Sequence, residues 1–140
     1  MIVKVKRLDK ELPLPAYAYP GDAAFDLYAR EKIEASPGQK IEVPTGLALE
    51  IPEGYVGLLW DKSSVGIKHG IKTLGGVIDC GFRGELVVGL VNLSKEQKIF
   101  EKGDKIAQMI IQRKETAVLA EVEELENSVR GGKGFGSSGK

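Results

Sequence analysis

Short turn-forming segments rich in proline and glycine recur through the middle of the chain and divide it into short apolar runs. Three of these segments are Ser36-Pro37-Gly38, Pro44-Thr45-Gly46 and Pro52-Glu53-Gly54. Proline cannot donate to a strand ladder and glycine favours turns, so each segment ends one run before the next begins. Turn signals spaced about eight to twelve residues apart predict a β-sandwich or barrel rather than βαβ units.

The strand candidates are identified by alternation or by apolar content. Residues 2–8 alternate apolar and basic side chains and predict a half-exposed strand, whereas the nearly continuous apolar run 55–60 predicts a strand buried on both faces. Further strands are expected at 23–29, 39–43, 47–51 and 105–113, and a single helical turn at 65–70. Residues 115–126 are ambiguous, because their Ala, Leu and Glu content favours a helix while 117–122 is short enough to be a last strand.

One acidic residue lies in a connection between two apolar runs. Val77 and Ile78 lead into Asp79, and the run 86–92 follows after Phe82, so the pattern predicts a β-hairpin with Asp79 near its tip. Glycines around this connection would let another molecule approach the backbone. A carboxylate beside an aromatic ring suits a small pocket with one general base. Taken alone, the pattern favours an ordinary turn aspartate.

Charge and cysteine content restrict the classes of partner. The 140 residues, expected to form one domain, include 20 Lys and Arg and 20 Asp and Glu, so there is no global basic field for bulk nucleic-acid binding. The single cysteine, Cys80, excludes an internal disulfide and fits a reducing compartment. No signal peptide or membrane span is apparent, so we expect a cytoplasmic protein without a membrane partner. His69, the only histidine, has no Cys or His nearby in sequence and is interpreted as structural.

Several polar residues have two explanations each. Ser63 and Ser64 follow Lys62 at the start of the expected helical turn, where they serve either as helix caps or, with the lysine, as a phosphate site. Gln108 is either a satisfied buried amide or a ligand contact. Asp26, among apolar neighbours, is by pattern an outward-facing strand residue.

The last eleven residues, 130–140, contain five glycines. Ordering such a segment costs about 1–2 kcal/mol per residue, so it forms no stable element by itself. It is either an unstructured terminus or an arm that becomes ordered on a ligand. Arg130, Lys133 and Phe135 favour the arm, because they are spaced like phosphate donors and a stacking ring.

Five separated segments, in order, resemble the five motifs of the trimeric dUTP pyrophosphatases (dUTPases). They are 15–27, 62–66, 76–85, 103–108 and 130–139, and include Gly76-Val77-Ile78-Asp79, Gly103-Asp104-Lys105-Ile106-Ala107-Gln108 and Gly134-Phe135-Gly136-Ser137-Ser138-Gly139. The resemblance implies an all-β, jelly-roll-like distorted barrel (β-clip) over residues 1–129 and a flexible C-terminal arm over 130–140. It further implies a homotrimer with shared active sites, and it favours a strand at 115–126.

The same resemblance implies a reaction and its catalytic residues. dUTP would be hydrolysed to dUMP and pyrophosphate by water attack on the α-phosphorus, keeping uracil out of DNA and supplying dUMP for thymidylate synthesis. Asp79 would orient and deprotonate the water, with Gln108 holding phosphate. Phe82 would lie against the deoxyribose. The uracil edge would pair with backbone around Thr73, Gly76, Val77, Ile78 and Val87.

Phosphate and metal ligands follow from the resemblance as well. Lys62, Ser63 and Ser64 would hold phosphates, and Asp26 would lie in the outer shell of a Mg²⁺ ion, bound through water. The arm would close over the nucleotide through Arg130, Phe135, Gly136, Ser137 and Ser138. Lys62 replaces the family's usual Arg, Gly81-Phe82 replaces the common Asp-Tyr, and Lys133 replaces a glycine of the arm.

Two alternatives compete with a dUTPase. The first is a dCTP deaminase, or a bifunctional deaminase and dUTPase, because its hairpin is often written Ile-Asp-x-Gly-Phe, as in residues 78–82. The deaminases carry a glutamate that moves protons on the returning strand, before the Asn that ends it. In this chain that position is Gly89, which disfavours a deaminase. The second is a non-catalytic trimeric β module, which the retained Asp79, Gln108, Arg130 and Phe135 argue against.

Overall fold

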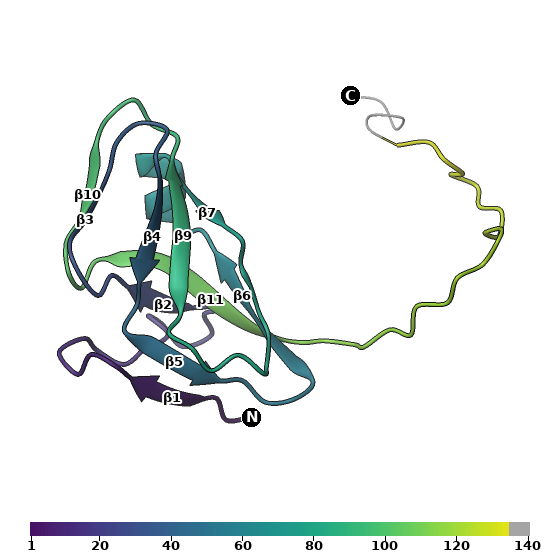
Figure 1. The fold of residues 1–140 in the computed structure, drawn as a ribbon, viewed down its shortest axis with the longest axis horizontal. Coiled ribbons are helices and arrows are strands. Elements are labelled where there is room, and N and C mark those ends of the chain that lie inside the picture. Colours follow the sequence, from purple (N-terminus) through teal and green to yellow (C-terminus); the bar gives the residue numbers. More distant parts are fainter. Residues whose placement is uncertain (135–140) are drawn as a thin grey trace.

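The computed structural model describes residues 1–134, which contain eleven short strands and one helical turn. In chain order the strands are β1 (Lys4–Arg7), β2 (Phe25–Tyr28), β3 (Ile33–Ala35), β4 (Lys40–Pro44), β5 (Leu47–Glu50), β6 (Tyr55–Trp60), β7 (Ile71–Leu74), β8 (Val77–Ile78), β9 (Val87–Asn92), β10 (Lys98–Phe100) and β11 (Lys105–Arg113). A single π-helical turn, η1 (Ser64–Lys68), lies between β6 and β7. The prediction of an all-β fold with one helical turn is confirmed (Figure 1).

Two main sheets enclose one core. The larger has the strand order β2-β11-β6-β8 and the smaller has the order β4-β9-β7, with antiparallel pairing throughout. Leu27 and Met109 from the first sheet and Val88 and Leu90 from the second are all fully buried in the same cluster. Two smaller antiparallel pairs, β1-β5 and β3-β10, complete the barrel.

Strand β9 shows how the sequence pattern sets the inside of the barrel. Its side chains alternate between exposed or half-buried and buried, so Val88, Leu90 and Asn92 point inward. The Asn92 amide donates to the carbonyls of Ala35 and Glu96, each at 2.8 Å, and its oxygen accepts from the backbone and hydroxyl of Ser94. A buried amide is tolerated here because all its bonds are made.

The predicted hairpin around Asp79 has a different partner strand. Residues 87–92 pair with β7, in the register Thr73 to Leu90, and not with β8, which pairs with β6. The reason is the backbone at Gly75 and Gly76, whose φ angles of 71° and 125° turn the chain across to β6. The segment with Asp79 is therefore part of a long connection between the two sheets.

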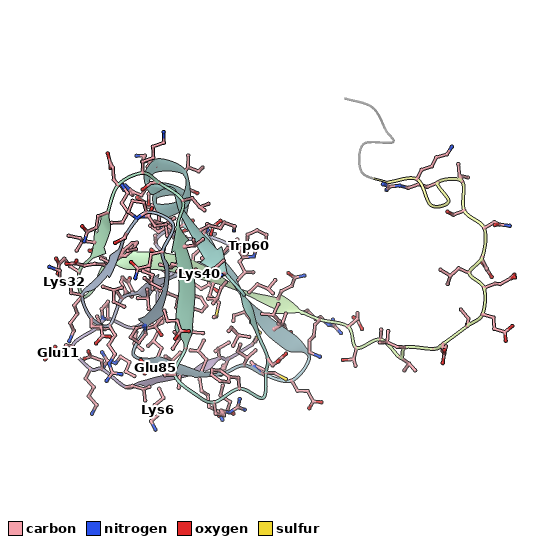
Figure 2. All side chains as sticks on the ribbon, turned by 45° about the horizontal axis from the view of Figure 1, so that its top comes forward. Lys6, Glu11, Lys32, Lys40, Trp60 and Glu85 are labelled. Carbon is pink, nitrogen blue, oxygen red and sulfur yellow. The ribbon has the colours of Figure 1, made fainter. Side chains whose placement is uncertain are left out.

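Two further predictions are wrong for this chain. The strand at 55–60, expected to be buried on both faces, has only Gly57 and Leu59 buried. Trp60 is 53% exposed, and Figure 2 shows it on the outside of the barrel. Residues 115–126 form no strand, because they leave the barrel after β11 and every one of them is exposed (Figure 1). A strand needs a neighbour for its backbone groups, and no edge of the described chain reaches this segment.

Candidate active site

Asp26 is held between two lysines. It lies on β2 opposite Gln108 of β11 and is 4% exposed, so the expectation of an outward-facing carboxylate is wrong. Lys62 Nζ donates to its Oδ1 at 2.8 Å, and Lys105 Nζ lies 2.7 Å from Oδ2 as an ion pair. Two cations therefore compensate one buried carboxylate.

The charge of Asp26 follows from these contacts. Burial opposes its ionisation, but the contacts with Lys105 and Lys62 outweigh burial and hold the pKa of Asp26 below its ordinary value of 3.8. The same contact raises the pKa of Lys105. Among residues 1–134, Oδ2 is the one buried side-chain oxygen or nitrogen without a directed hydrogen bond, although Lys105 lies within ion-pair distance. Oδ2 is itself buried, and Lys105 is its charged neighbour.

A polar cavity of about 230 Å³ opens beside this carboxylate. Its walls include Asp26, Lys62 and Gln108, together with small residues of the segment before β2. The Gln108 amide nitrogen donates to the backbone oxygen of Asp61 at 2.9 Å, which fixes the plane of the amide. Three residues that the sequence places far apart thus share one cavity.

The two serines lie at the beginning of η1, next to this cavity in sequence. Ser63 occupies the cap position with a helical backbone, and its side chain makes no capping hydrogen bond. Capping therefore does not explain Ser63. Both serines are exposed, so their hydroxyls are accessible to a ligand.

A second cavity, of about 240 Å³, lies between β6 and the connection that follows β7. It is lined by Leu58, Leu59, Trp60, Lys72, Thr73, Gly75, Gly76 and Val77. The Gly76 oxygen accepts from the Leu59 amide at 2.8 Å, and a Cβ on Gly76 would lie 3.1 Å from the Leu59 oxygen. Only glycine fits this backbone closely. Three of the residues expected to face uracil, Thr73, Gly76 and Val77, are thus brought together, while Ile78 and Val87 lie outside this lining.

Asp79 and Phe82 form the ends of one tight turn. The Phe82 amide donates to the Asp79 oxygen at 3.1 Å, and Arg83 Nη1 donates to the carbonyls of Cys80 and Phe82. Both Asp79 and Phe82 are exposed. The Phe82 ring lies over Gly84, where an added Cβ would be 2.8 Å from the ring.

The described chain does not bring all expected site residues together. Asp79 and Phe82 line neither cavity, and Arg130 is exposed on the segment that leaves the barrel, where its Nε donates to the Lys133 oxygen at 2.8 Å. Phe135, Gly136, Ser137 and Ser138 lie outside the described residues.

Sequence reasoning missed two anchoring carboxylates. Glu85 binds Arg30 through both oxygens, at 3.2 and 3.1 Å, and accepts from the Gly46 amide at 2.8 Å; Figure 2 shows it among the side chains near the β1-β5 end. Asp61, directly before Lys62, contacts Lys72 and Thr73. Burial opposes ionisation of Asp61, but those contacts hold its pKa below the ordinary value. Its position beside Lys62 was the available signal.

Gly89 occupies the position at which a deaminase would carry a glutamate, and its backbone lies close to β7. It is paired with Leu74 of β7, and a Cβ at this position would lie 3.3 Å from both the Cβ and the oxygen of Leu74. A side chain here would require Leu74 to shift by a few tenths of an ångström. Glycine at this position carries no group that can move a proton, which disfavours deamination.

Two features are absent from residues 1–134. No group of three or more His, Cys, Asp or Glu side chains is clustered closely enough there to hold a metal ion by itself. In the same range no helix is long and apolar enough to cross a membrane.

The fold and cavities together define an all-β barrel with a polar cavity that is lined by Asp26, Lys62 and Gln108. Comparison with known proteins then gives the family. The dUTPase family model matches residues 10–139. The deoxyuridine 5'-triphosphate nucleotidohydrolase of Corynebacterium glutamicum is 45% identical, and the alignment covers 99% of this chain and 95% of that protein. The protein of the same name from Thermobifida fusca is 43% identical, and the alignment covers 98% of this chain and 78% of that protein. The chain belongs to the dUTPase family.

Solved structures agree with this assignment. A mutant dUTPase of Staphylococcus bacteriophage 80alpha with dUpNHpp superposes with a TM-score of 0.88 at 33% identity, over 99% of both chains. A mutant dUTPase from phage phi11 of S. aureus, described as revealing the coordination of a structural Mg(II) ion, has a TM-score of 0.84 at 28% identity, over 91% of this chain and all of the other. The predicted family and its jelly-roll-like barrel are confirmed.

Proposed function

We propose that this protein hydrolyses dUTP to dUMP and pyrophosphate by attack of water on the α-phosphorus. The observation that carries the proposal is the family match over residues 10–139, supported by the fold shared with a dUTPase that binds dUpNHpp. In the cell the reaction would lower dUTP, and so keep uracil out of DNA, and would supply dUMP for thymidylate synthesis. The single cysteine, Cys80, fits a cytoplasmic location.

The triphosphate would bind where Lys62, Ser63, Ser64 and Gln108 are found. Lys62 supplies a cation at the wall of a polar cavity, and Gln108 supplies an amide on the same wall. The exposed serine hydroxyls at the start of η1 add donors for phosphate oxygens. Lysine keeps the charge that the family's usual arginine provides, but it contacts phosphate as a point charge instead of a fork.

The base and sugar would bind at the second cavity and the turn beside it. Thr73, Gly76 and Val77 line that cavity, with Ile78 and Val87 on the adjoining strands. Backbone groups that pair with uracil would leave buried donors or acceptors unmatched with cytosine, which discriminates strongly. Phe82 would lie against the deoxyribose, and Asp79, at the start of the same turn, would accept the proton of the attacking water.

Magnesium fits the residues around Asp26 when it is held through water. Mg²⁺ keeps several waters and binds through one or two carboxylates plus substrate phosphates, so it needs no all-protein cage. Asp26 supplies a carboxylate whose contacts favour the charged form, on the wall of the polar cavity. The ion would neutralise charge on the triphosphate and favour departure of pyrophosphate.

A homotrimer with shared active sites is part of the proposal, together with a β domain over 1–129 and an arm over 130–140. Asp79 and Gln108 do not share a cavity within one chain, so a second subunit would bring them together. Large apolar side chains of the departing segment are exposed and need a partner surface. They are Val118, Leu119, Val122, Leu125 and Val129. The arm, with Arg130, Phe135, Gly136, Ser137 and Ser138, would close over the nucleotide.

The test is to incubate the protein with Mg²⁺ and, separately, dUTP, dCTP, UTP and dTTP, and to assay both pyrophosphate and ammonia. Asp79→Asn serves as a control that keeps the size of the side chain and removes the base. We expect pyrophosphate from dUTP alone, lost in the variant. Ammonia from dCTP would instead identify a deaminase, and no product from any nucleotide would identify a non-catalytic module.

A further inference from the structure

Asp61 joins the two main sheets at the corner between the two cavities. It follows the last residue of β6, in the larger sheet, and its Oδ1 accepts from both the backbone amide and the hydroxyl of Thr73 on β7, in the smaller sheet, each at 2.7 Å. Its Oδ2 accepts from Lys72 Nζ at 2.6 Å. Lys72 and Thr73 line the cavity between β6 and the connection after β7.

The other contacts of Asp61 lead to the polar cavity. Its backbone oxygen accepts from the Gln108 amide nitrogen, and the next residue is Lys62, which binds Asp26. Gly66 of η1 packs against the Asp61 side chain, since a Cβ there would lie 3.3 Å from the Cβ of Asp61. One residue thus contacts the wall of one cavity through its side chain and a wall residue of the other through its backbone.

We propose that Asp61 is a positioning residue that fixes the base-binding wall at Thr73 relative to the phosphate-binding residues Lys62 and Gln108. The inference rests on the proposed function, because it assigns the two cavities to the two halves of dUTP. Asp61 touches no reacting atom in this scheme. It orders two segments whose sheets share no strand pairing at this corner.

The competing explanation for Asp61 is a surface ion pair with Lys72 that has no effect on either cavity. The other side-chain hydrogen bonds of Asp61 distinguish a positioning role from such an ion pair. Exposed ion pairs contribute little, so a purely superficial Asp61 would be replaceable without effect on either cavity. The two bonds from Thr73 are different, since they hold a backbone amide at the edge of β7. Losing them would let the strand shift and change how both ligand halves fit.

The experiment measures each half of the ligand separately, by calorimetry with deoxyuridine and with inorganic tripolyphosphate in Mg²⁺. Three variants divide the contacts of Asp61. Asp61→Ala removes all side-chain bonds, Asp61→Asn keeps acceptors for Thr73 but removes the charge facing Lys72, and Thr73→Val removes only the hydroxyl donor. Glu50→Gln is the matched control, because Glu50 also accepts from a lysine, Lys4, at 2.8 Å, on the separate β1-β5 pair.

We expect Asp61→Ala to weaken both ligands about tenfold or more, Thr73→Val to weaken deoxyuridine about threefold, and Asp61→Asn to leave both affinities near those of the wild type, with melting temperatures of the last two variants near that of the wild type. Glu50→Gln should change neither affinity. Loss of deoxyuridine binding alone in Asp61→Ala, or no change in any variant, would overturn the role of Asp61. Wild-type protein that binds neither ligand would overturn the proposed function itself, and the role with it.

Discussion

Lys62 Nζ and Asp26 Oδ1 are joined by a hydrogen bond of 2.8 Å on the wall of the polar cavity. Lys62 is the proposed phosphate donor, so its ammonium group would exchange the carboxylate for phosphate when nucleotide binds. Lys105, 2.7 Å from the other oxygen of Asp26, would remain as counter-ion after the exchange. A buried carboxylate with two cations can release one of them without being left uncompensated.

Replacing Lys62 with methionine should raise the KM for dUTP by about tenfold to a hundredfold, because a hydrogen bond to a charged group contributes about 1.5–3 kcal/mol. Lys62→Arg should restore most of the affinity, since the charge and donors return. Steady-state kinetics at saturating Mg²⁺ measures both. Lys4→Met is the control, because Lys4 is exposed and pairs with Glu50 on the separate β1-β5 pair. An unchanged KM in Lys62→Met would remove Lys62 from the phosphate site.

Asp26 should make stability depend on pH in acid. Its folded-state pKa lies below the ordinary value of 3.8, so its contribution is present in full above that value and is lost as the pH falls through the folded-state pKa. Asp26→Asn should therefore lower the free energy of unfolding by about 1–3 kcal/mol at pH 7. The difference from the wild type should shrink below about pH 4. Urea unfolding at pH 7, 4 and 3 tests this, and a difference that grows in acid would contradict it.

Prediction from sequence worked best where periodicity and turns agree locally. The strand over 105–113 has the bounds of β11, and the prolines and glycines at 36–38, 44–46 and 52–54 separate strands as expected. Strands β3, β7 and β10 were missed. Each is only three or four residues long and depends on a strand elsewhere in the sequence, since β3 and β10 pair with each other and β7 pairs with β9. Local pattern carries no information about such pairing.

The candidate site was harder to predict because its geometry depends on the same distant pairing. The glycines at 75 and 76 predict a turn, but they do not predict that the chain then crosses to pair with β6. Asp26 was predicted to face solvent because it is charged and no cation lies beside it in the sequence. The lysines that compensate its charge, Lys62 and Lys105, are distant in sequence and come close only in the fold. The motif resemblance supplied these residues together, whereas residue pattern alone left each of them open.

Gly76 and Gly75 offer a matched test of the second cavity. Both have positive φ, but an added Cβ would meet nothing within 4 Å at Gly75 and the Leu59 oxygen at 3.1 Å at Gly76. Gly75→Ala should lower the free energy of unfolding by about 1–2 kcal/mol, the cost of a left-handed alanine. Gly76→Ala should cost more and weaken deoxyuridine binding. Chemical denaturation and calorimetry measure both, and equal effects at the two positions would contradict the close backbone approach.

Removal of residues 130–140 tests the proposed arm. The truncated chain should keep the oligomeric state and melting temperature of the full chain, because residues 130–133 are exposed and no described residue of the segment belongs to the hydrophobic core cluster. Turnover of dUTP should fall at least about a hundredfold, since the donors and ring proposed to close the site are gone. Arg130→Ala in the full chain is the milder variant. Full activity after truncation would assign catalysis to the β domain alone.

Gly84→Ala tests whether the Phe82 ring determines sugar specificity. The new Cβ would lie 2.8 Å from the ring, so the ring must leave its present place over Gly84. Because Phe82 is 44% exposed, the ring can rotate, and stability should change by less than about 1 kcal/mol. If Phe82 contacts deoxyribose, displacement of the ring in Gly84→Ala should raise the KM for dUTP and reduce discrimination against UTP. Phe82→Ala should have the same two effects, but larger. Kinetics with both nucleotides decides this, and unchanged discrimination in both variants would exclude Phe82 from the sugar site.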